Sequence, residues 1–157
     1  MYDVCVVYLL RERAIDGRIV TEVLLGEKLT GLGVGKFVGA GGKLEPGESA
    51  RSAAIREVAE ELGVAVNARD LEGISDITYP FVDKDEWSHR SFGFVTRVWA
   101  GTPAASDELA PSWFALDDIP FDRMWADARL WLPRALAGEF VEATYSFRSD
   151  GTLVESA

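Results

Sequence analysis

The stretch from Gly41 to Val64 reads GGKLEPGESARSAAIREVAEELGV and predicts a glycine-rich turn followed by a helix. Pro46 and Gly47 form a turn signal, and Ser49 just after them is a residue type that caps helix starts. Gly63 stands where a helix commonly ends, because glycine adopts the left-handed conformation there at little steric cost. We therefore expect a helix that begins just after Ser49 and ends just before Gly63.

The expected helix has two distinct faces. Its apolar face consists of residues at helical spacing: Ala54, Ile55, Val58 and Leu62. Glu57, Glu60 and Glu61 fall at positions i, i+3 and i+4, so their carboxylates share a second face. Clustered glutamates usually form a solvated surface. Carboxylates also bind Mg²⁺, which keeps coordination positions for phosphate, so a metal site is the alternative.

Arg56 adds to the second interpretation. It lies one turn before Glu60, from where a guanidinium can hold that carboxylate in position beside a metal. Such a constellation suits the binding of divalent metal against a polyphosphate.

This segment resembles the signature of the Nudix hydrolase family. The likeness is free of gaps and covers every defining position of the signature: Gly42, Glu48, Arg56, Glu57, Val58, Glu60, Glu61, Gly63 and Val64. A match of this length is specific. We therefore favour the metal site over the solvated face.

Most of the remaining chain resembles the animal branch of this family that hydrolyses oxidised purine nucleoside triphosphates. The likeness is carried by residues 36–43, 101–103, 106–108, 113–114, 116–117, 119–125 and 140–151, while 79–94 align loosely. It implies a Nudix α/β/α sandwich, with a mixed β-sheet between helices. It also implies hydrolysis of a nucleoside triphosphate, such as 8-oxo-dGTP, to the monophosphate and pyrophosphate.

The resemblance further implies the catalytic and metal-binding residues. Besides Arg56, these are Glu57, Glu60, Glu61, the carbonyl of Gly41, and Glu108 from a separate loop. Mg²⁺ ions, or Mn²⁺ in their place, would lower the pKa of the attacking water. One of the helical glutamates or Glu108 would accept the proton.

For the base, the resemblance implies a pocket with an aromatic wall. Trp125 would stack on a purine, Asp127 would hydrogen-bond to it, and Phe147 would line the same pocket. Lys28 would lie near the mouth. His89, the only histidine, is either a solvated strand residue or a wall contact.

Two positions depart from the family pattern. Val38 stands where the family has an asparagine that reads the base, and Ala128 stands where it has a second aspartate. A base-reading site discriminates because the wrong base leaves buried polar groups unpaired. Apolar residues remove that penalty, so we expect a broad preference among purines.

Length and charge fit one enzyme-sized domain over residues 1–157. A net charge of −10 argues against binding a nucleic-acid polymer, which demands a basic surface. Cys5 is the only cysteine, which excludes a disulfide within the chain and fits the cytoplasm. The apolar run 4–10 is too short to span a membrane. We expect a monomer, with a dimer as the alternative.

Periodicity and turn signals predict the other elements. A hairpin is expected from 3–10 and 19–25 around Asp16-Gly17, and another from 140–148 and 152–155 around Asp150-Gly151. The remaining expected elements are strands at 37–40, 71–82, 87–99 and 113–116 and a helix at 127–137. The glycine-rich stretch 30–35 is either a flexible connector or a phosphate cradle.

Two other functions also fit the sequence. A Nudix enzyme can act on a dinucleotide such as NADH, ADP-ribose or a diadenosine polyphosphate. A protein of this fold can also bind a nucleotide metabolite without cleaving it. The intact set of acids favours an enzyme, and the absence of a long insertion favours a nucleoside triphosphate over a dinucleotide.

Overall fold

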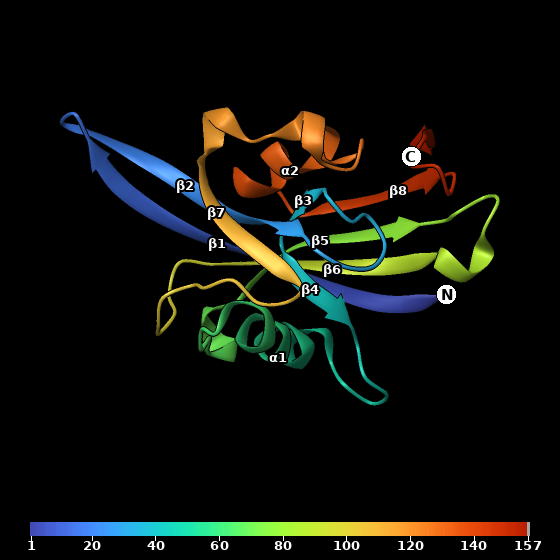
Figure 1. Cartoon of the computed structure of the whole chain (residues 1–157), viewed down its shortest axis with the longest axis horizontal. Helices are drawn as coiled ribbons and strands as arrows, with labels where there is room; N and C mark the ends of the chain where they lie inside the picture. Colours follow the sequence, from blue (N-terminus) through green and yellow to red (C-terminus); the bar gives the residue numbers. More distant parts are fainter. Residues whose placement is uncertain (157) are drawn as a thin grey trace.

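The computed structural model describes residues 1–156, in which a curled mixed β-sheet carries helix α1 on one face and helix α2 on the other (Figure 1). The strands are β1 (Tyr2–Ile15), β2 (Arg18–Lys28), β3 (Phe37–Val38), β4 (Ala40–Lys43), β5 (Glu72–Tyr79), β6 (His89–Thr96), β7 (Leu109–Ala115), β8 (Val141–Phe147) and β9 (Leu153–Ser156). The α-helices are α1 (Ala50–Leu62) and α2 (Ala128–Leu136). Short 3₁₀ turns cover 68–70, 85–87, 116–118 and 121–123.

The sheet is mixed because two of its strand pairs are parallel. Its order is β3-β2-β1-β6-β5-β8-β9, with β4 also paired to β1 and β7 to β2. β1 runs parallel to β6, and β5 runs parallel to β8, whereas the other pairs are antiparallel. The expected hairpin between β1 and β2 is confirmed. Its turn residues Asp16 and Gly17 have φ angles of 49° and 75°, as tight hairpin turns require.

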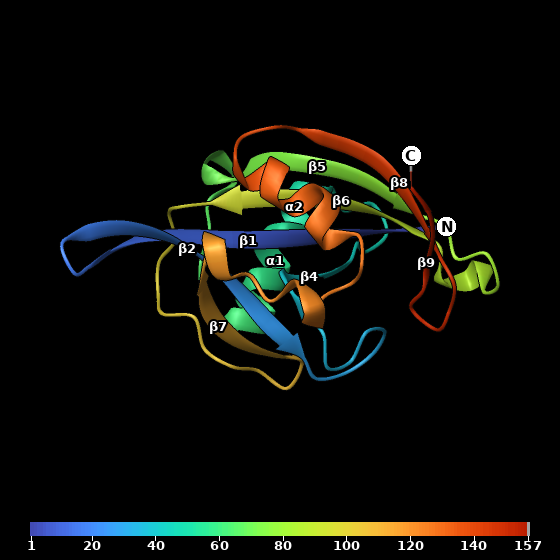
Figure 2. The ribbon, with the colours of Figure 1, turned by 90° about the horizontal axis from the view of Figure 1, so that it is seen from above.

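Strand β1 separates two cores, because successive side chains of a strand point to opposite faces. Cys5, Val7 and Leu9 belong to the core beneath α1, whereas Tyr8 and Leu10 belong to the core beneath α2. Figure 2 shows α2 over β5, β6 and β8, with α1 beneath the sheet. The predicted apolar face of α1 is confirmed: Ala54, Val58 and Leu62 are buried, and Ile55 is partly buried.

Both ends of α1 are capped as the sequence predicts. The Ser49 Oγ accepts a hydrogen bond from the Ser52 amide at 3.1 Å. Gly63 has a φ of 72° and donates its amide proton to the Ala59 carbonyl at 3.1 Å. These caps fix where the acidic face of the helix begins and ends.

Replacing Ser49 with alanine should lower the free energy of unfolding by about 1 kcal/mol, because the first turn of α1 loses a side-chain acceptor. Urea denaturation would measure the change. Ser52→Ala is the matched control, since the Ser52 side chain caps nothing and only its amide takes part in the bond. Equal losses in both variants would contradict the capping role.

Several predicted boundaries differ from the structure. The strand expected at 37–40 is two strands, because β3 pairs with β2 while β4 pairs with β1, and Gly39 lies between them. A Cβ on Gly39 would come within 2.7 Å of the Val6 side chain, so only glycine fits this change of partner. The strand expected at 113–116 begins earlier, at Leu109, and pairs with β2 along its whole length.

Candidate active site

The acidic face of α1 packs directly against the glycines of β4. Glu57 and Glu61 are each only 7% exposed. The Gly41 amide donates a hydrogen bond of 2.7 Å to the Glu61 Oε1. A Cβ on Gly42 would lie 2.6 Å from the nearest Glu57 carboxylate oxygen. Glycine at position 42 therefore lets Glu57 approach the backbone of β4, and the Gly41 amide holds Glu61 against the same strand.

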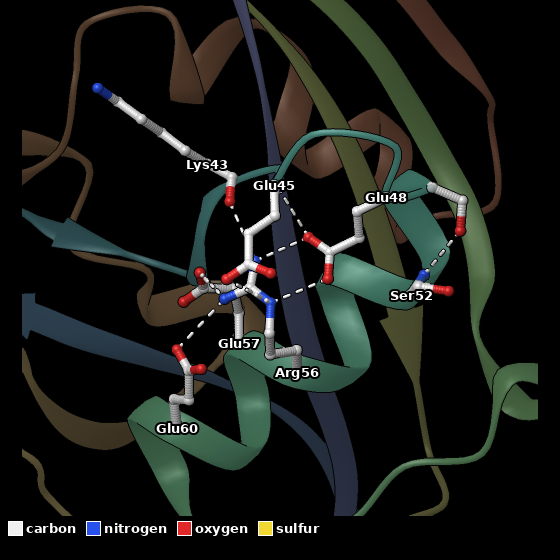
Figure 3. Close-up of polar contacts among 8 residues, drawn as sticks. Lys43, Glu45, Glu48, Ser52, Arg56, Glu57 and Glu60 are labelled. Carbon is white, nitrogen blue, oxygen red and sulfur yellow. Dashed lines mark hydrogen bonds and ion pairs between the residues drawn. The ribbon is translucent and has the colours of Figure 1, made fainter.

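Arg56 is the centre of an ion-pair network (Figure 3). It makes two hydrogen bonds to Glu48, from Nε at 2.9 Å and from Nη2 at 2.8 Å. Its Nη1 donates to Glu57 at 2.9 Å and to Glu60 at 3.3 Å. The Nη2 also donates to the Lys43 carbonyl at 3.1 Å. The sequence predicts the Glu60 contact, but Glu48 and Glu57 are the closer partners.

The three helical glutamates are not equivalent. The Glu60 side chain is 58% exposed, in contrast to Glu57 and Glu61. With 3.6 residues per turn, Glu60 is rotated by about 100° from Glu61, away from the sheet. The expected acidic face is therefore divided into a buried pair and one residue at its solvent edge.

Burial shapes the electrostatics of the buried pair. It raises the pKa of Glu61 to about 7, and the Glu57 and Glu108 carboxylates act in the same direction, whereas the Gly41 amide and Lys28 oppose it. Burial also raises the pKa of Glu57, and its bond to Arg56 opposes this. At Glu48 the hydrogen bonds from Arg56 lower the pKa to about 2.

Glu108 reaches the same neighbourhood from a different part of the chain. Its carbonyl accepts the Leu29 amide at 2.9 Å, which holds its loop beside the end of β2. Its side chain is exposed, yet its charge influences Glu57 and Glu61. Within residues 1–156, no three acidic, histidine or cysteine side chains are grouped closely enough to hold a metal ion. Two of the glutamates, Glu57 and Glu60, are instead bonded to Arg56. The carboxylate oxygens gathered here are still the ligand type that Mg²⁺ and Mn²⁺ take.

A cavity of about 550 Å³ lies on the α2 side of the sheet. Six residues that the sequence assigns to the site line it: Lys28, Val38, Gly41, Trp125, Asp127 and Phe147. Ala128 lines it too, so both positions that depart from the family pattern belong to its wall. The predicted base-binding residues are therefore brought together.

Trp125 is held in place by its neighbours. Its ring meets Phe147 edge-on at a centroid distance of 5.2 Å and Phe81 at 6.1 Å. The Lys36 Nζ lies 5.2 Å from the ring centroid. A Cβ on Gly33, whose φ is 81°, would lie 2.8 Å from the Trp125 Nε1. The glycine-rich loop thus packs against the aromatic wall of the cavity.

Asp127 has partners that the sequence does not reveal. Its Oδ2 accepts hydrogen bonds from the Tyr79 hydroxyl at 2.6 Å and from the Trp131 Nε1 at 2.8 Å. Burial raises its pKa, and these two donors oppose the rise. Its Oδ1 has no partner from another residue in the described chain, where every fully enclosed side-chain polar atom has one. Asp127 therefore links β5 and α2 at the wall of the cavity.

The two partners of Asp127 differ in whether the sequence indicates them. Trp131 lies four residues after Asp127 on the expected second helix, a spacing at which side chains meet. Tyr79 comes from β5, in the stretch that aligns loosely with the family, and no local signal links it to Asp127.

Residues 2–135 match the family model described as the NUDIX domain. The chain belongs to the Nudix family.

Relatives and solved structures agree with this Nudix assignment. The chain is 40% identical over 133 residues to the oxidized purine nucleoside triphosphate hydrolase of Danio rerio, covering 85% of this chain and 83% of the relative. It is 36% identical over 132 residues to the protein of that name from Mus musculus, covering 84% and 83%. The crystal structure of a MutT protein from Bacillus halodurans superimposes with a TM-score of 0.81 at 22% identity, over 100% of this chain and 97% of that one.

The predicted Nudix fold and hydrolase class are thereby confirmed. The Nudix signature accounts for the segment that packs against β4. None of the helices in residues 1–156 combines the length and the hydropathy of a membrane-spanning segment.

Proposed function

We propose that this chain is a single Nudix domain over residues 1–157 that hydrolyses purine nucleoside triphosphates, oxidised forms included, to monophosphate and pyrophosphate. One observation carries the proposal. Gly41 and Gly42 line the aromatic cavity and also contact the buried carboxylates of Glu61 and Glu57. A base in the cavity therefore has its phosphates directed toward the acids. The names of the two relatives support the same substrate class.

Divalent metal is part of this proposal, since Nudix hydrolases generally use ions such as Mg²⁺. Glu57, Glu60, Glu61, Glu108 and the Gly41 carbonyl would hold it. When bound, it offsets phosphate charge and lowers the pKa of the attacking water. Arg56 keeps Glu57 in position through their bond of 2.9 Å. Lys28, which lines the cavity near Glu61, would offset further phosphate charge.

The proton of the attacking water has alternative acceptors. Glu108 and the glutamates of α1 all lie near the phosphate end, and each is a carboxylate suited to general-base work. Arg56 positions Glu57 and Glu60, and Glu61 is anchored by the Gly41 amide, whereas Glu108 is held only through its backbone.

Base preference should be broad among purines. Trp125 offers a stacking face that any purine can use, and Val38 and Ala128 present no polar group to the base. We expect dGTP, dATP and 8-oxo-dGTP to differ in kcat/KM by no more than roughly tenfold, or about 1.4 kcal/mol. Trp125→Ala should weaken all three together. Val38→Asn combined with Ala128→Asp should sharpen selection for oxidised purines.

The test is a hydrolysis panel with Mg²⁺ in which the products are identified by chromatography. The panel contains dGTP, dATP, 8-oxo-dGTP, NADH, ADP-ribose and a diadenosine polyphosphate. Pyrophosphate released from the triphosphates supports the proposal. Preferential cleavage of a dinucleotide, or tight nucleotide binding without turnover, would contradict it. A thousandfold preference for 8-oxo-dGTP would show that other residues read the base.

Glu108→Ala should lower kcat at least about tenfold and raise KM much less, because a charge beside the reacting phosphate acts most strongly in the transition state. Steady-state kinetics at saturating Mg²⁺ would measure both constants. Asp107→Ala is the matched control from the same exposed loop. An unchanged kcat in Glu108→Ala would show that Glu108 is a solvated surface residue without a catalytic role.

A further inference from the structure

His89 occupies a row of aromatic rings on the cavity side of the sheet. As the first residue of β6, it is in register with Tyr2 of β1 and Tyr79 of β5. Its ring lies 5.3 Å from that of Tyr2 and 5.1 Å from that of Tyr79, measured between centroids. Phe81 approaches at 6.1 Å. The imidazole is therefore held in one orientation against the cavity that it lines.

One hydrogen bond fixes the tautomer of this ring. The His89 Nδ1 lies 2.8 Å from the Trp87 carbonyl oxygen. A carbonyl can only accept, so Nδ1 carries the proton and donates it. In the neutral ring, Nε2 is then an acceptor with a free lone pair. Burial lowers the pKa of His89, and the nearby Lys28 and Lys43 lower it further, against the effect of the Trp87 carbonyl.

The His89 ring lines the cavity, and its Nε2 atom is not enclosed by protein. This atom has no hydrogen-bond partner in the described chain, where every fully enclosed side-chain polar atom has one, so it is not sealed within the protein. Lys28 and Lys43, whose charges act on this ring, line the same cavity, and as cations they cannot accept a hydrogen bond from a ligand. An acceptor in an aromatic wall selects for a donor on whatever enters.

We propose that His89 is a specificity-determining residue whose Nε2 accepts a hydrogen bond from an N–H group of the purine base. This inference rests on the proposed function, because it requires the base to occupy this cavity. In nucleotides, guanine, adenine and 8-oxoguanine all carry such donors, whereas unsubstituted purine, whose N9 is bonded to the sugar, carries none. His89 thus admits many purines and selects against those that leave a buried acceptor unpaired.

Two variants distinguish a hydrogen bond from His89 to the base from a purely structural role of its bond to Trp87. In His89→Asn, the side-chain amide lies where Nδ1 was and can still donate to Trp87, but the side chain ends short of the Nε2 position. In His89→Gln, one more methylene carries a carbonyl oxygen toward that position. If His89 acts only through its bond to Trp87, His89→Asn should keep the wild-type base preference. If His89 accepts a hydrogen bond from the base, His89→Gln should keep that preference and His89→Asn should lose it. Thermal melting of both variants checks that they fold.

The measurement is the dissociation constant of dGMP and of purine 2′-deoxyriboside monophosphate, from quenching of tryptophan fluorescence. We expect the wild-type protein to bind dGMP at least about tenfold more tightly than the unsubstituted nucleotide. His89→Asn should reduce this ratio to below roughly threefold, mainly by weakening dGMP, and His89→Gln should retain most of it. An unchanged ratio in His89→Asn, or equal weakening of both ligands, overturns the proposal.

A second measurement needs no variant. Because the chain has one histidine, its ¹⁵N resonances need no assignment among residues. Binding of dGMP should move the Nε2 resonance upfield, as acceptance of a hydrogen bond does, whereas the unsubstituted nucleotide should leave it in place. Equal responses to both ligands would overturn the proposal even if the variants unfold.

Failure of the proposed function is distinguishable from failure of this inference. If the wild-type protein releases no pyrophosphate from any triphosphate, the proposed function fails, and the monophosphate constants still decide the role of His89. If triphosphates are hydrolysed but the ratio in His89→Asn equals that of the wild type, the inference alone fails.

Discussion

Replacing Glu61 with glutamine should lower kcat by at least about 100-fold, because a principal charge of the proposed metal site is lost. The substitution preserves shape, and the amide oxygen of glutamine can still accept the Gly41 amide bond that now measures 2.7 Å. Removing charge from a side chain that is only 7% exposed also removes a desolvation cost, so the protein should remain folded. Initial rates with saturating dGTP and Mg²⁺ would measure the loss.

The matched control is Glu12→Gln on the exposed part of β1, which changes net charge equally and should leave kcat unaltered. A titration of Mn²⁺ separates weakened metal binding from a lost charge: the former is relieved at high metal, whereas the latter persists. Turnover of Glu61→Gln near that of the wild type would contradict the proposal that Glu61 holds a metal ion.

Asp127→Ala should lower the free energy of unfolding by about 2–4 kcal/mol, since the Tyr79 hydroxyl and the Trp131 Nε1 would both lose their buried acceptor. Asp127→Asn should cost much less, because an amide oxygen can accept from both donors. Urea denaturation monitored by far-ultraviolet circular dichroism would compare the two. The kcat/KM for purine triphosphates should fall in Asp127→Ala, since the pocket wall is no longer held.

Asp122 supplies the control for this pair. Its side chain is 97% exposed, and its ion pair with Arg129 lies on the surface, so Asp122→Ala should change stability by less than about 1 kcal/mol. Equal losses in Asp127→Ala and Asp127→Asn would show that the negative charge, and not acceptance from two donors, is what the fold requires.

The sequence predicts α1 well because its determinants are local. A cap at Ser49, a left-handed glycine at position 63 and apolar residues at helical spacing all lie within 15 residues of one another. The hairpin of β1 and β2 is likewise predicted by the residues of its own turn. The family signature also groups Glu57 and Glu61 with the glycines of β4, against which the structure places them.

What could not be predicted depends on contacts between distant segments. The split of 37–40 into β3 and β4 reflects two different partner strands, which no local period reveals. The pairing of Tyr79 with Asp127 spans 48 residues. The difference between Glu60 and Glu61 depends on how far α1 is rotated against the sheet. The sequence alone does not decide between a solvated strand residue and a wall contact for His89, because its surroundings come from the two strands that flank β6.

The two cores on either side of β1 have a consequence for how such an enzyme can change. The glutamates of α1 that are proposed to hold metal lie under the sheet, whereas the cavity proposed for the base is lined by residues of β3, β6, α2 and β8 on the opposite face. The glycines of β4 line the cavity and also contact the glutamates of α1. Under the proposed function, mutations can therefore remodel the cavity for a new base without disturbing α1, and base selectivity can change while the reaction is preserved.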